Sequence, residues 1–223
     1  QTGTVRAVAC HRVGDGWRDV SGSDDSAVRV WDVEGGATAR PAADGHERDV
    51  TSLACFDDGR CLVTGSEDGT LLVWDVVKGG APLLKLEGHT KAVLAIACHG
   101  EGDARRIVSG GADKLVLVWD AVKGGAPLLK LEGHTGYMMA VACHDAGDGW
   151  RIVSGGEDTD AAREGRGGDT VLLVWDAVAG GAPLLKLEGH TDWVNAIACH
   201  GVGDGWRYVS GGNDGMLLVW DAV

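Results

Sequence analysis

Residues 71–75 read LLVWD and residues 86–89 read LEGH, and near copies of these two motifs recur along the chain. The Trp-Asp pairs stand at Trp31, Trp74, Trp119, Trp175 and Trp220. The Gly-His pairs stand at His46, His89, His134 and His190, each 15 residues after a Trp. A Trp on an apolar segment, followed at constant spacing by a Gly-His turn, indicates one supersecondary unit copied along the chain. A repeat fold is therefore expected.

The composition places the chain among globular proteins. It has 223 residues, of which 44% are hydrophobic, with 37 Gly and only 4 Pro, so a large core is possible. No run of 18 apolar residues occurs, and no membrane insertion is expected. No secretory signal is visible at the start of the sequence.

The charge narrows the choice of partners. With 33 acidic and 20 basic residues, the formal net charge is −13. This argues against nucleic acid as a ligand, because binding to phosphates needs a cationic surface. An acidic surface suits other proteins, including basic peptides; simple solubility explains the charge equally well.

The cysteines follow the repeat. Five of the six close the same short apolar segment in each unit: Cys10, Cys55, Cys98, Cys143 and Cys199. A residue copied once per repeat indicates packing as a small buried hydrophobe. Only Cys61 is extra, and it could face Cys55 across a hairpin turn. We favour a reduced, intracellular protein (cytoplasmic or nuclear) over a disulfide.

Alignment on Cys and Trp divides the chain into units 1–45, 46–88, 89–133, 134–189 and 190–223. Each unit accommodates four short strands, expected in the third unit over residues 93–98, 106–111, 115–120 and 127–132. The third strand is apolar on both faces, which predicts burial on both. The links are rich in Gly and Asp, as tight hairpins require. Pro82, Pro127 and Pro183 are each expected to begin a fourth, outer strand, because proline cannot donate to a ladder.

Five sheets that are apolar on both faces need neighbours on both sides, and radial stacking supplies them. No sustained 3.6-residue pattern occurs, which excludes a helical solenoid. The predicted fold is all-β: a single β-propeller domain over residues 1–223, with five blades of four-stranded antiparallel sheet. The fifth unit is 11 residues shorter than the third. Its blade is therefore expected to lack the outer strand, which gives an open or partial propeller.

The repeated pattern GHT…V..(V/I).(C/F)…(S/T)G..D…(L/V).VWD resembles the WD-repeat (WD40) family over essentially the whole chain. Members of this family are β-propellers that act as rigid scaffolds for other proteins, and the resemblance implies the same here. Two features depart from the usual pattern. Cys stands where an aromatic residue commonly closes the first strand, and the turn after this strand often reads GDGW.

The resemblance also implies a hydrogen-bonded structural set of His, Ser/Thr, Asp and Trp within a blade. The matching residues are His46, Thr64, Asp68 and Trp74 in the second unit, His89, Ser109, Asp113 and Trp119 in the third, and His190, Ser210, Asp214 and Trp220 in the fifth. The physical reason is that a buried Trp N–H must find an acceptor.

These sets do not indicate catalysis. A Ser-His-Asp triad needs an exposed nucleophile and an oxyanion hole, whereas near copies beside a buried Trp in successive units indicate architecture. The Cys-His pairs, such as Cys98-His99, point to opposite faces of a strand. No clustered ligand spacing such as CxxC occurs. No catalytic residue, metal or cofactor is expected.

Two features interrupt the regular repeat. The fourth unit holds 11 extra residues between Asp158 and Asp169, which form either a tolerated surface loop or a segment that contacts a partner. Trp17, Trp150 and Trp206 stand in turns at the opposite end of the blades. They form either an aromatic partner site or a cover for their own or the next hairpin.

The positions that vary between units mark a candidate interface, which we call the rim. They follow the Gly-His turn (Glu47, Arg48, Asp49, Lys91, Ala92, Gly136, Tyr137, Asp192 and Trp193) or precede the turn Asp (Asp24, Glu67, Ala112, Glu157 and Asn213). Both groups are expected at the same end of the blades. The predicted partner-binding residues are Arg48, Asp49, Glu67, Lys91, Tyr137, Glu157, Asp192, Trp193 and Asn213. The mixture of aromatic and charged residues is typical of an interface, although drift on an unconstrained surface is the alternative.

The sequence thus predicts a non-catalytic scaffold that binds a protein or peptide on the rim. One alternative is a structural accessory subunit of a large complex; an enzyme that uses the central channel is the least favoured. Apolar faces left open at the ends of the blade series would favour an oligomer or a larger complex.

Overall fold

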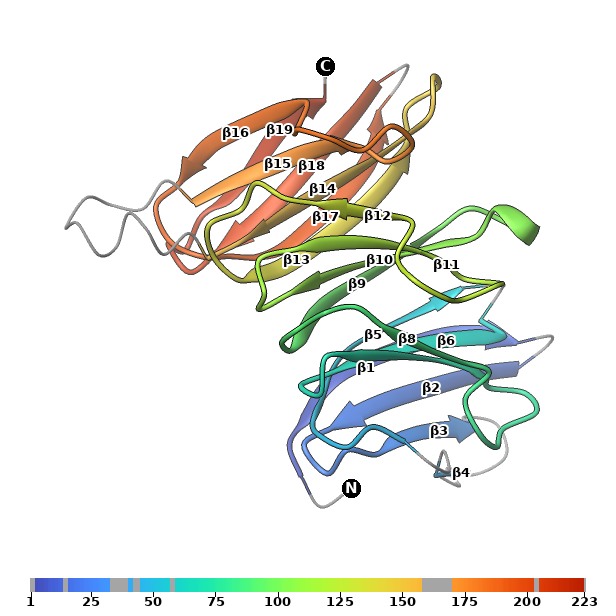
Figure 1. Ribbon diagram of the computed structural model, residues 1–223. Helices are drawn as coiled ribbons and strands as arrows, with labels where there is room; N and C mark the ends of the chain where they lie inside the picture. The colour runs from blue at the N-terminus through green and yellow to red at the C-terminus, as the bar shows by residue number, and fades with distance from the viewer. Residues whose placement is uncertain are drawn as a thin grey trace. The chain divides into compact units, whose positions relative to one another are not determined.

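The structure is a computed structural model that describes residues 3–13, 16–32, 40–41, 45–56, 59–157, 170–202 and 205–222. In these residues the regular elements are β-strands, apart from one short 3₁₀ helix, η1 (Gly102–Ala104). The strands form five antiparallel sheets, one for each repeat (Figure 1). The prediction of an all-β, propeller-type fold is confirmed.

The sheets follow the chain, and the strands within each sheet are hydrogen-bonded in chain order. Sheet A contains β1 (Val5–Val13), β2 (Gly16–Ser23), β3 (Val28–Asp32) and β4 (Arg40–Pro41). Sheet B contains β5 (Val50–Phe56), β6 (Cys61–Ser66), β7 (Thr70–Asp75) and β8 (Leu84–Glu87). Sheet C contains β9 (Val93–His99), β10 (Arg106–Gly111), β11 (Val116–Asp120) and β12 (Leu129–Leu131). Sheet D contains β13 (Met138–Asp145), β14 (Trp150–Gly156), β15 (Thr170–Asp176) and β16 (Leu185–His190).

Sheet E contains only β17 (Val194–Val202), β18 (Gly205–Gly212) and β19 (Leu217–Ala222). The last blade therefore has three strands in the described part of the chain, which confirms the predicted lack of an outer strand.

The chain divides into two compact units. Unit 1 comprises Gln1–Ile107 and Trp119–Pro127, and unit 2 comprises Val108–Val118 and Leu128–Val223. Unit 1 contains sheets A and B, and unit 2 contains sheets D and E. The division runs through the strands of sheet C and not along a repeat boundary.

The outer strands begin later than the sequence predicts. β8, β12 and β16 start at Leu84, Leu129 and Leu185, two residues after the prolines. The reason is the missing proline N–H, which stops the ladder from extending back to the predicted start. The residue that follows each proline still contributes one bond. In sheet B, the Leu83 N–H donates to the Val73 carbonyl at 2.7 Å.

Neighbouring sheets within a unit meet through one repeated contact. An apolar side chain on the first strand of one sheet lies on a glycine in the second strand of the preceding sheet. We call the side chain the knob and the glycine the hole. The four knob-on-hole pairs are Val50 on Gly22 and Val93 on Gly65 in unit 1, and Met138 on Gly110 and Val194 on Gly155 in unit 2. All four knobs are 0% exposed. A Cβ at Gly65 would lie 2.6 Å from Val93 Cγ1, so only glycine fits without a shift.

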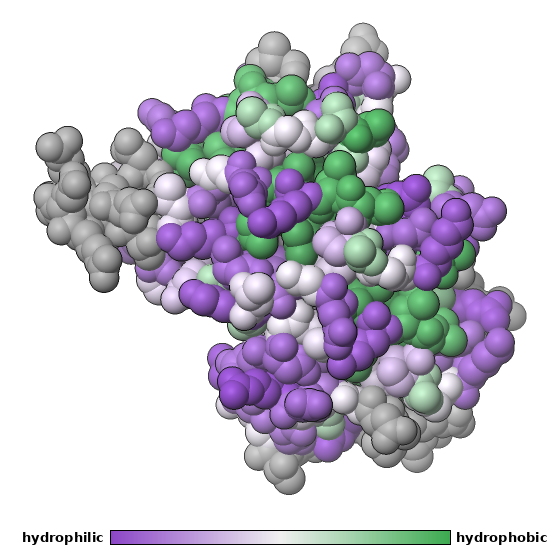
Figure 2. All heavy atoms as spheres, viewed as in Figure 1, coloured by the Kyte–Doolittle hydropathy of each residue, from purple (hydrophilic) through white to green (hydrophobic). Residues whose placement is uncertain are grey.

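Apolar clusters extend two of these contacts, between sheets A and B and between sheets D and E. In unit 2, Leu172 and Val174 of sheet D pack with Val194 and Tyr208 of sheet E. These clusters form because the third strands are apolar on both faces. On the outside, hydrophilic side chains leave hydrophobic areas between them on the viewed face (Figure 2). Across the described residues there is no helix long and apolar enough to cross a membrane.

Candidate functional site

The hydrogen-bonded set of sheet E forms a chain of donors and acceptors that runs in one direction. Trp220 Nε1–H donates to Ser210 Oγ at 2.9 Å, and Ser210 Oγ lies 2.7 Å from His190 Nε2. His190 Nδ1 lies 2.8 Å from Asp214 Oδ2. A carboxylate only accepts, so Nδ1 carries the imidazole proton, and the Ser210 O–H donates to Nε2. Every polar atom of the set is thus satisfied.

Sheet B contains the same arrangement. Trp74 Nε1–H donates to Thr64 Oγ1 at 2.9 Å, and Thr64 Oγ1 lies 2.8 Å from His46 Nε2. His46 Nδ1 lies 3.3 Å from Asp68 Oδ2, and the Glu47 N–H donates to the same oxygen at 3.0 Å. Asp68 therefore connects the buried set to the first residue after the Gly-His turn, and it fixes the base of the rim.

Sheets C and D extend the series. In unit 1, the rings of His89 and Trp119 lie 6.3 Å apart, and in sheet C the Leu115 N–H donates to Asp113 at 3.3 Å. In sheet D, Ser154 Oγ accepts from Trp175 Nε1 at 2.8 Å and lies 2.7 Å from His134 Nε2. The sequence analysis assigned no set to this unit, although His134, Ser154 and Trp175 align with the others. Asp158 and Asp169, and the extra residues between them, lie outside the described residues.

The geometry of these sets does not suit catalysis. The hydroxyl residues Thr64, Ser109, Ser154 and Ser210 are all 0% exposed, so no substrate carbonyl could reach them. Burial lowers the pKa of His134 to about 4. Burial also lowers the pKa of His46, against the opposing effect of Asp68. These imidazoles therefore stay neutral near pH 7 and serve as fixed hydrogen-bond partners.

The Asp residues of three Trp-Asp pairs have a role that the sequence analysis missed. Asp120 Oδ1 accepts the N–H groups of Val122 and Lys123 at 2.9 and 2.8 Å, and Asp75 and Asp176 bind their following turns in the same way. These backbone hydrogen bonds lower the pKa of Asp120. The signal in the sequence is the Gly-Gly pair that follows each Asp, because both glycines take positive φ (65° and 91° at Gly124 and Gly125).

The two groups of rim positions lie next to each other within each sheet. The Glu67 N–H donates to the Asp49 carbonyl at 3.0 Å, the Glu157 N–H to the Tyr137 carbonyl at 2.9 Å, and the Asn213 N–H to the Trp193 carbonyl at 2.8 Å. In these three cases the variable residue before the turn Asp is tied to the third residue after a Gly-His histidine. The structure therefore brings the predicted pairs together on a fixed backbone.

The rim differs between the two units. In unit 1 it is charged: Arg48, Glu67 and Lys91 are exposed, and Asp49 is half-buried. Arg6 forms an ion pair with Asp24 and lies 3.8 Å from Asp49.

In unit 2 the rim carries large aromatic residues. Tyr137 and Trp193 are each 40% exposed, Asp192 and Asn213 are exposed, and Glu157 is half-buried. Tyr137 and Trp193 occupy the same place in consecutive repeats, three residues after the histidine. Gly136 is buried, and Ala92 and Ala112 are half-buried, so these three offer little contact surface.

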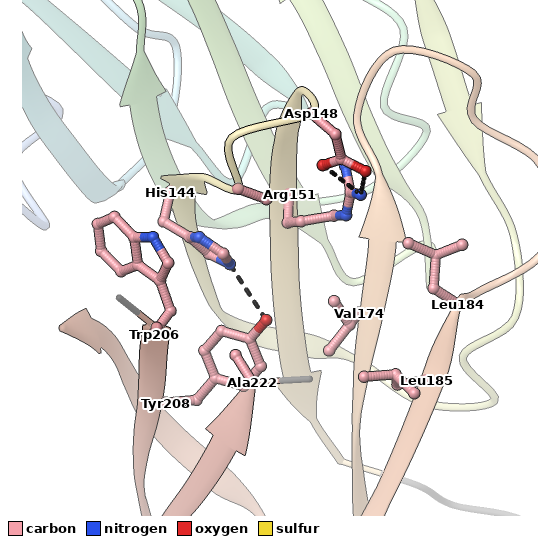
Figure 3. Close-up of a pocket in the computed structure, with 11 residues that line it drawn as sticks. His144, Asp148, Arg151, Val174, Leu184, Leu185, Trp206, Tyr208 and Ala222 are labelled. Carbon is pink, nitrogen blue, oxygen red and sulfur yellow. Dashed lines mark hydrogen bonds and ion pairs between the residues drawn. The ribbon is translucent and has the colours of Figure 1, made fainter. Parts of the chain in front are cut away.

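Unit 2 also contains a cavity of about 480 Å³ between sheets D and E (Figure 3). Val174, Leu184 and Leu185 form an apolar wall, which faces His144, Tyr208 and Trp206. His144 Nδ1 lies 3.0 Å from the Asp145 carbonyl and so carries the proton, and the Tyr208 O–H donates to Nε2 at 3.1 Å. Burial raises the pKa of Tyr208 to about 12, which keeps the phenol protonated.

The polar groups of this cavity bind one another. Arg151 Nη2 donates to both carboxylate oxygens of Asp148, at 2.9 and 3.0 Å. No Ser, Thr or Cys is among the described residues that line the cavity. The cavity could hold an apolar or aromatic group. The sequence analysis missed Tyr208. The signal that could have revealed it is the change of residue type at this position of the repeat, where sheets B, C and D have Leu62, Ile107 and Ile152.

The remaining predicted features can be placed as well. The ring of Trp206 lies 4.6 Å from that of His144, so this tryptophan covers the adjacent sheet, while Trp17 is 50% exposed. Neither Cys55 nor Cys61 takes part in a disulfide. Within the described ranges, no group of three or more His, Cys, Asp and Glu residues is placed to hold a metal ion.

Comparison with known proteins supports one family. A family model described as "WD domain, G-beta repeat" matches residues 41–75, 80–120 and 181–221, which is just over half of the chain. Among curated protein sequences, none matches. The solved structure titled "Structure of U3-55K" superposes with a TM-score of 0.76 at 23% sequence identity. The match covers 99% of this chain and 62% of that one, so the chain spans less than two thirds of the length of its structural relative.

Proposed function

Because the chain belongs to the WD-repeat family, we propose that it is a non-catalytic scaffold that binds a protein or peptide on its rim. WD40 repeats generally mediate protein–protein interaction, and the family is typically non-catalytic. The buried hydroxyl groups of the hydrogen-bonded sets support the absence of catalysis in this chain. The specific proposal concerns where binding occurs and what kind of partner binds there.

One observation carries this proposal: two large aromatic side chains are exposed at equivalent places on a rigid turn. Tyr137 and Trp193 are each 40% exposed, and their carbonyl groups are held by hydrogen bonds from Glu157 and Asn213. An aromatic residue on a fixed backbone loses little conformational entropy when it binds, which is why Tyr and Trp dominate binding hot spots. The hydrogen-bonded sets beneath explain why the backbone is fixed.

The charge around these anchors favours a basic partner. Asp192 is adjacent to Trp193, and Glu157 is bonded to the Tyr137 backbone. The whole chain carries a formal charge of −13. A peptide that places an apolar side chain against the aromatic rings and Lys or Arg beside the carboxylates would match both features.

The experiment is selection from a random peptide library displayed on phage, with the wild-type protein as bait. We expect the selected peptides to be enriched in Lys and Arg. With one selected peptide as probe, Trp193→Ala and Tyr137→Ala should each weaken binding by about 1–3 kcal/mol, or roughly 5- to 150-fold in Kd.

Trp17→Ala is the matched control, because Trp17 is also exposed (50%) but lies at the start of β2, far along the strand from the rim residues. It should leave the Kd unchanged. If Trp17→Ala weakened binding and the two rim variants did not, the binding surface would lie at the other end of the sheets. Unfolding curves should show that all three variants keep the fold.

A further inference from the structure

The two aromatic anchors of the rim lie at equivalent ends of neighbouring sheets. Tyr137 immediately precedes β13 of sheet D, and Trp193 immediately precedes β17 of sheet E. β13 and β17 contact each other, and Val194, the first residue of β17, lies on Gly155 of sheet D. All these residues belong to unit 2. The packing of two sheets within one unit therefore sets the distance between the anchors.

The exposure of the anchors follows from their place at the strand ends. Sheet D is packed on both faces within unit 2, against Gly110 of sheet C on one side and Val194 of sheet E on the other. Tyr137 is nevertheless 40% exposed, and Trp193 in sheet E has the same exposed fraction. A packed neighbouring sheet therefore leaves this end of a sheet open.

The distance between the anchors limits the conformation of a partner that contacts both. Sheets that pack face to face lie about 10 Å apart, so equivalent positions in two neighbouring sheets have about this separation. The two side chains of the partner must therefore lie on one face of its backbone and about 10 Å apart along it.

Polyproline II meets this requirement with few residues. It has three residues per turn and a rise of about 3.1 Å per residue, so side chains i and i+3 share one face and lie about 9 Å apart. In a β-strand, side chains i and i+2 on one face are about 7 Å apart, and i and i+4 are about 13 Å apart. An α-helix would use i and i+7, and a free helix of about two turns is unstable in water. Polyproline II is a major conformer of unfolded chains and keeps its backbone solvated, so little conformational entropy is lost on binding.

A fixed carboxylate distinguishes the two anchors. Asp192 is exposed in the linker from β16 to β17, and its Oδ1 accepts the Trp193 N–H at 2.7 Å. The equivalent residue beside Tyr137 is Gly136, which is buried and has no side chain to offer. A cationic side chain of the partner is therefore attracted to the Trp193 end of the site.

We propose that the rim of unit 2 binds a proline-containing segment in the polyproline II conformation, with two prolines three residues apart on Tyr137 and Trp193. A Lys or Arg next to the proline at Trp193 pairs with Asp192. Proline suits both places, because its fixed φ favours polyproline II and because aromatic side chains bind its ring. This inference rests on the proposed function, to which it adds the conformation of the partner, the spacing of its two contacts and the place of its charge.

Three peptides of equal composition test the spacing by NMR titration of the wild-type protein. The prolines are three residues apart in KPSAPGA, two apart in KPSPAGA and four apart in KPSAGPA. We expect KPSAPGA to shift the indole N–H signal of Trp193, which is identified by its absence from the Trp193→Ala spectrum. The other two peptides should bind about 5- to 150-fold more weakly, because each contacts one anchor only. Tyr137→Ala should remove the difference between the three peptides, and the matched control Trp17→Ala should keep it.

A second pair of peptides tests the charge. Asp192→Asn keeps the oxygen that accepts the Trp193 N–H and removes the charge, so it should bind KPSAPGA and QPSAPGA equally, whereas the wild type should prefer KPSAPGA. Equal binding of the three spacings by the wild type, or no binding of KPSAPGA, overturns this inference. The proposed function is judged separately, by whether Trp193→Ala and Tyr137→Ala weaken the peptides selected from the random library.

Discussion

Two stretches of this chain have the same sequence and opposite surroundings. Residues 172–176 and 217–221 both read LLVWD, and both form the third strand of a sheet, β15 in sheet D and β19 in sheet E. In β15 the first Leu and the Val are 0% and 2% exposed, and in β19 they are 71% and 58% exposed. The pentapeptide therefore does not determine its own burial.

The difference follows from what covers each strand. β15 pairs with β14 and β16, and Val194 and Tyr208 of the next sheet lie against its face. Among the described strands β19 pairs with β18 alone, and no atom of the described residues lies within 4 Å of a Cβ placed at Gly211 of β18. In a repeat fold each sheet is stabilised mainly by its neighbours, so identical sequences contribute unequally to the free energy of unfolding.

The largest effect is expected for the tryptophans. Trp175→Ala should lower the free energy of unfolding by about 3–5 kcal/mol, because Trp175 is 0% exposed and its loss leaves a cavity and removes the N–H that donates to Ser154 Oγ. We expect a loss of similar size for Trp74→Ala and for Trp119→Ala. Trp220→Ala should have a smaller effect, because its ring is only half-buried. Urea unfolding measures the difference, and a loss below about 1 kcal/mol for Trp175→Ala would contradict the assigned burial.

The leucines sharpen the comparison. Leu172→Ala should lower the free energy of unfolding by about 2–5 kcal/mol, whereas Leu217→Ala should change it by no more than about 0.5 kcal/mol. Both changes remove the same atoms from the same pentapeptide, so each is the control for the other. Equal losses in urea unfolding at low protein concentration would mean that the face of β19 is covered.

The glycines probe the holes themselves. Gly65→Ala should destabilise by about 1–3 kcal/mol, because its Cβ would lie 2.6 Å from Val93 Cγ1. Gly211→Ala meets nothing within 4 Å and should be neutral or stabilising by up to about 1 kcal/mol. Thermal unfolding at low protein concentration separates the two. A clear destabilisation by Gly211→Ala would show that the hole in sheet E is already filled.

The smallest effect concerns pH and sheet D. The pKa of His134 is lowered from 6.5 to about 4 by burial, so the folded state prefers the neutral imidazole. This contribution to stability is complete above pH 6.5 and is lost as the pH falls towards 4, by on the order of 1–2 kcal/mol. His134→Gln should flatten the pH dependence of the unfolding free energy in that window. Parallel curves for wild type and His134→Gln would argue against a buried neutral histidine.

Much of this structure could be predicted from periodicity alone. The regular spacing of the Trp-Asp and Gly-His pairs divided the chain into five units and so predicted five sheets. The shortness of the fifth unit predicted that the last sheet lacks its outer strand. The same reasoning predicted that the third strand is buried on both faces, which holds for Leu172 but not for Leu217. Burial depends on a neighbouring sheet, and no feature of LLVWD reports whether that neighbour is present.

Features that occur once were harder to predict than features that repeat. The Tyr208–His144 bond joins two sheets across 64 residues. His144 belongs to a repeated Cys-His pair, but Tyr stands at the position of Tyr208 in one unit only. The turn role of Asp75, Asp120 and Asp176 was missed for another reason. The Trp-Asp pair indicated a strand end, and the following backbone amides become visible as partners only when the turn geometry is known.

Hydrogen exchange in the two LLVWD pentapeptides tests the central claim most directly. Identical sequences have nearly identical intrinsic exchange rates, so any difference in amide protection between residues 172–176 and 217–221 comes from their surroundings. At low protein concentration we expect β15 to be strongly protected and β19 to exchange much faster, because one edge of β19 and one of its faces are open. Equal protection of the two pentapeptides would contradict this account.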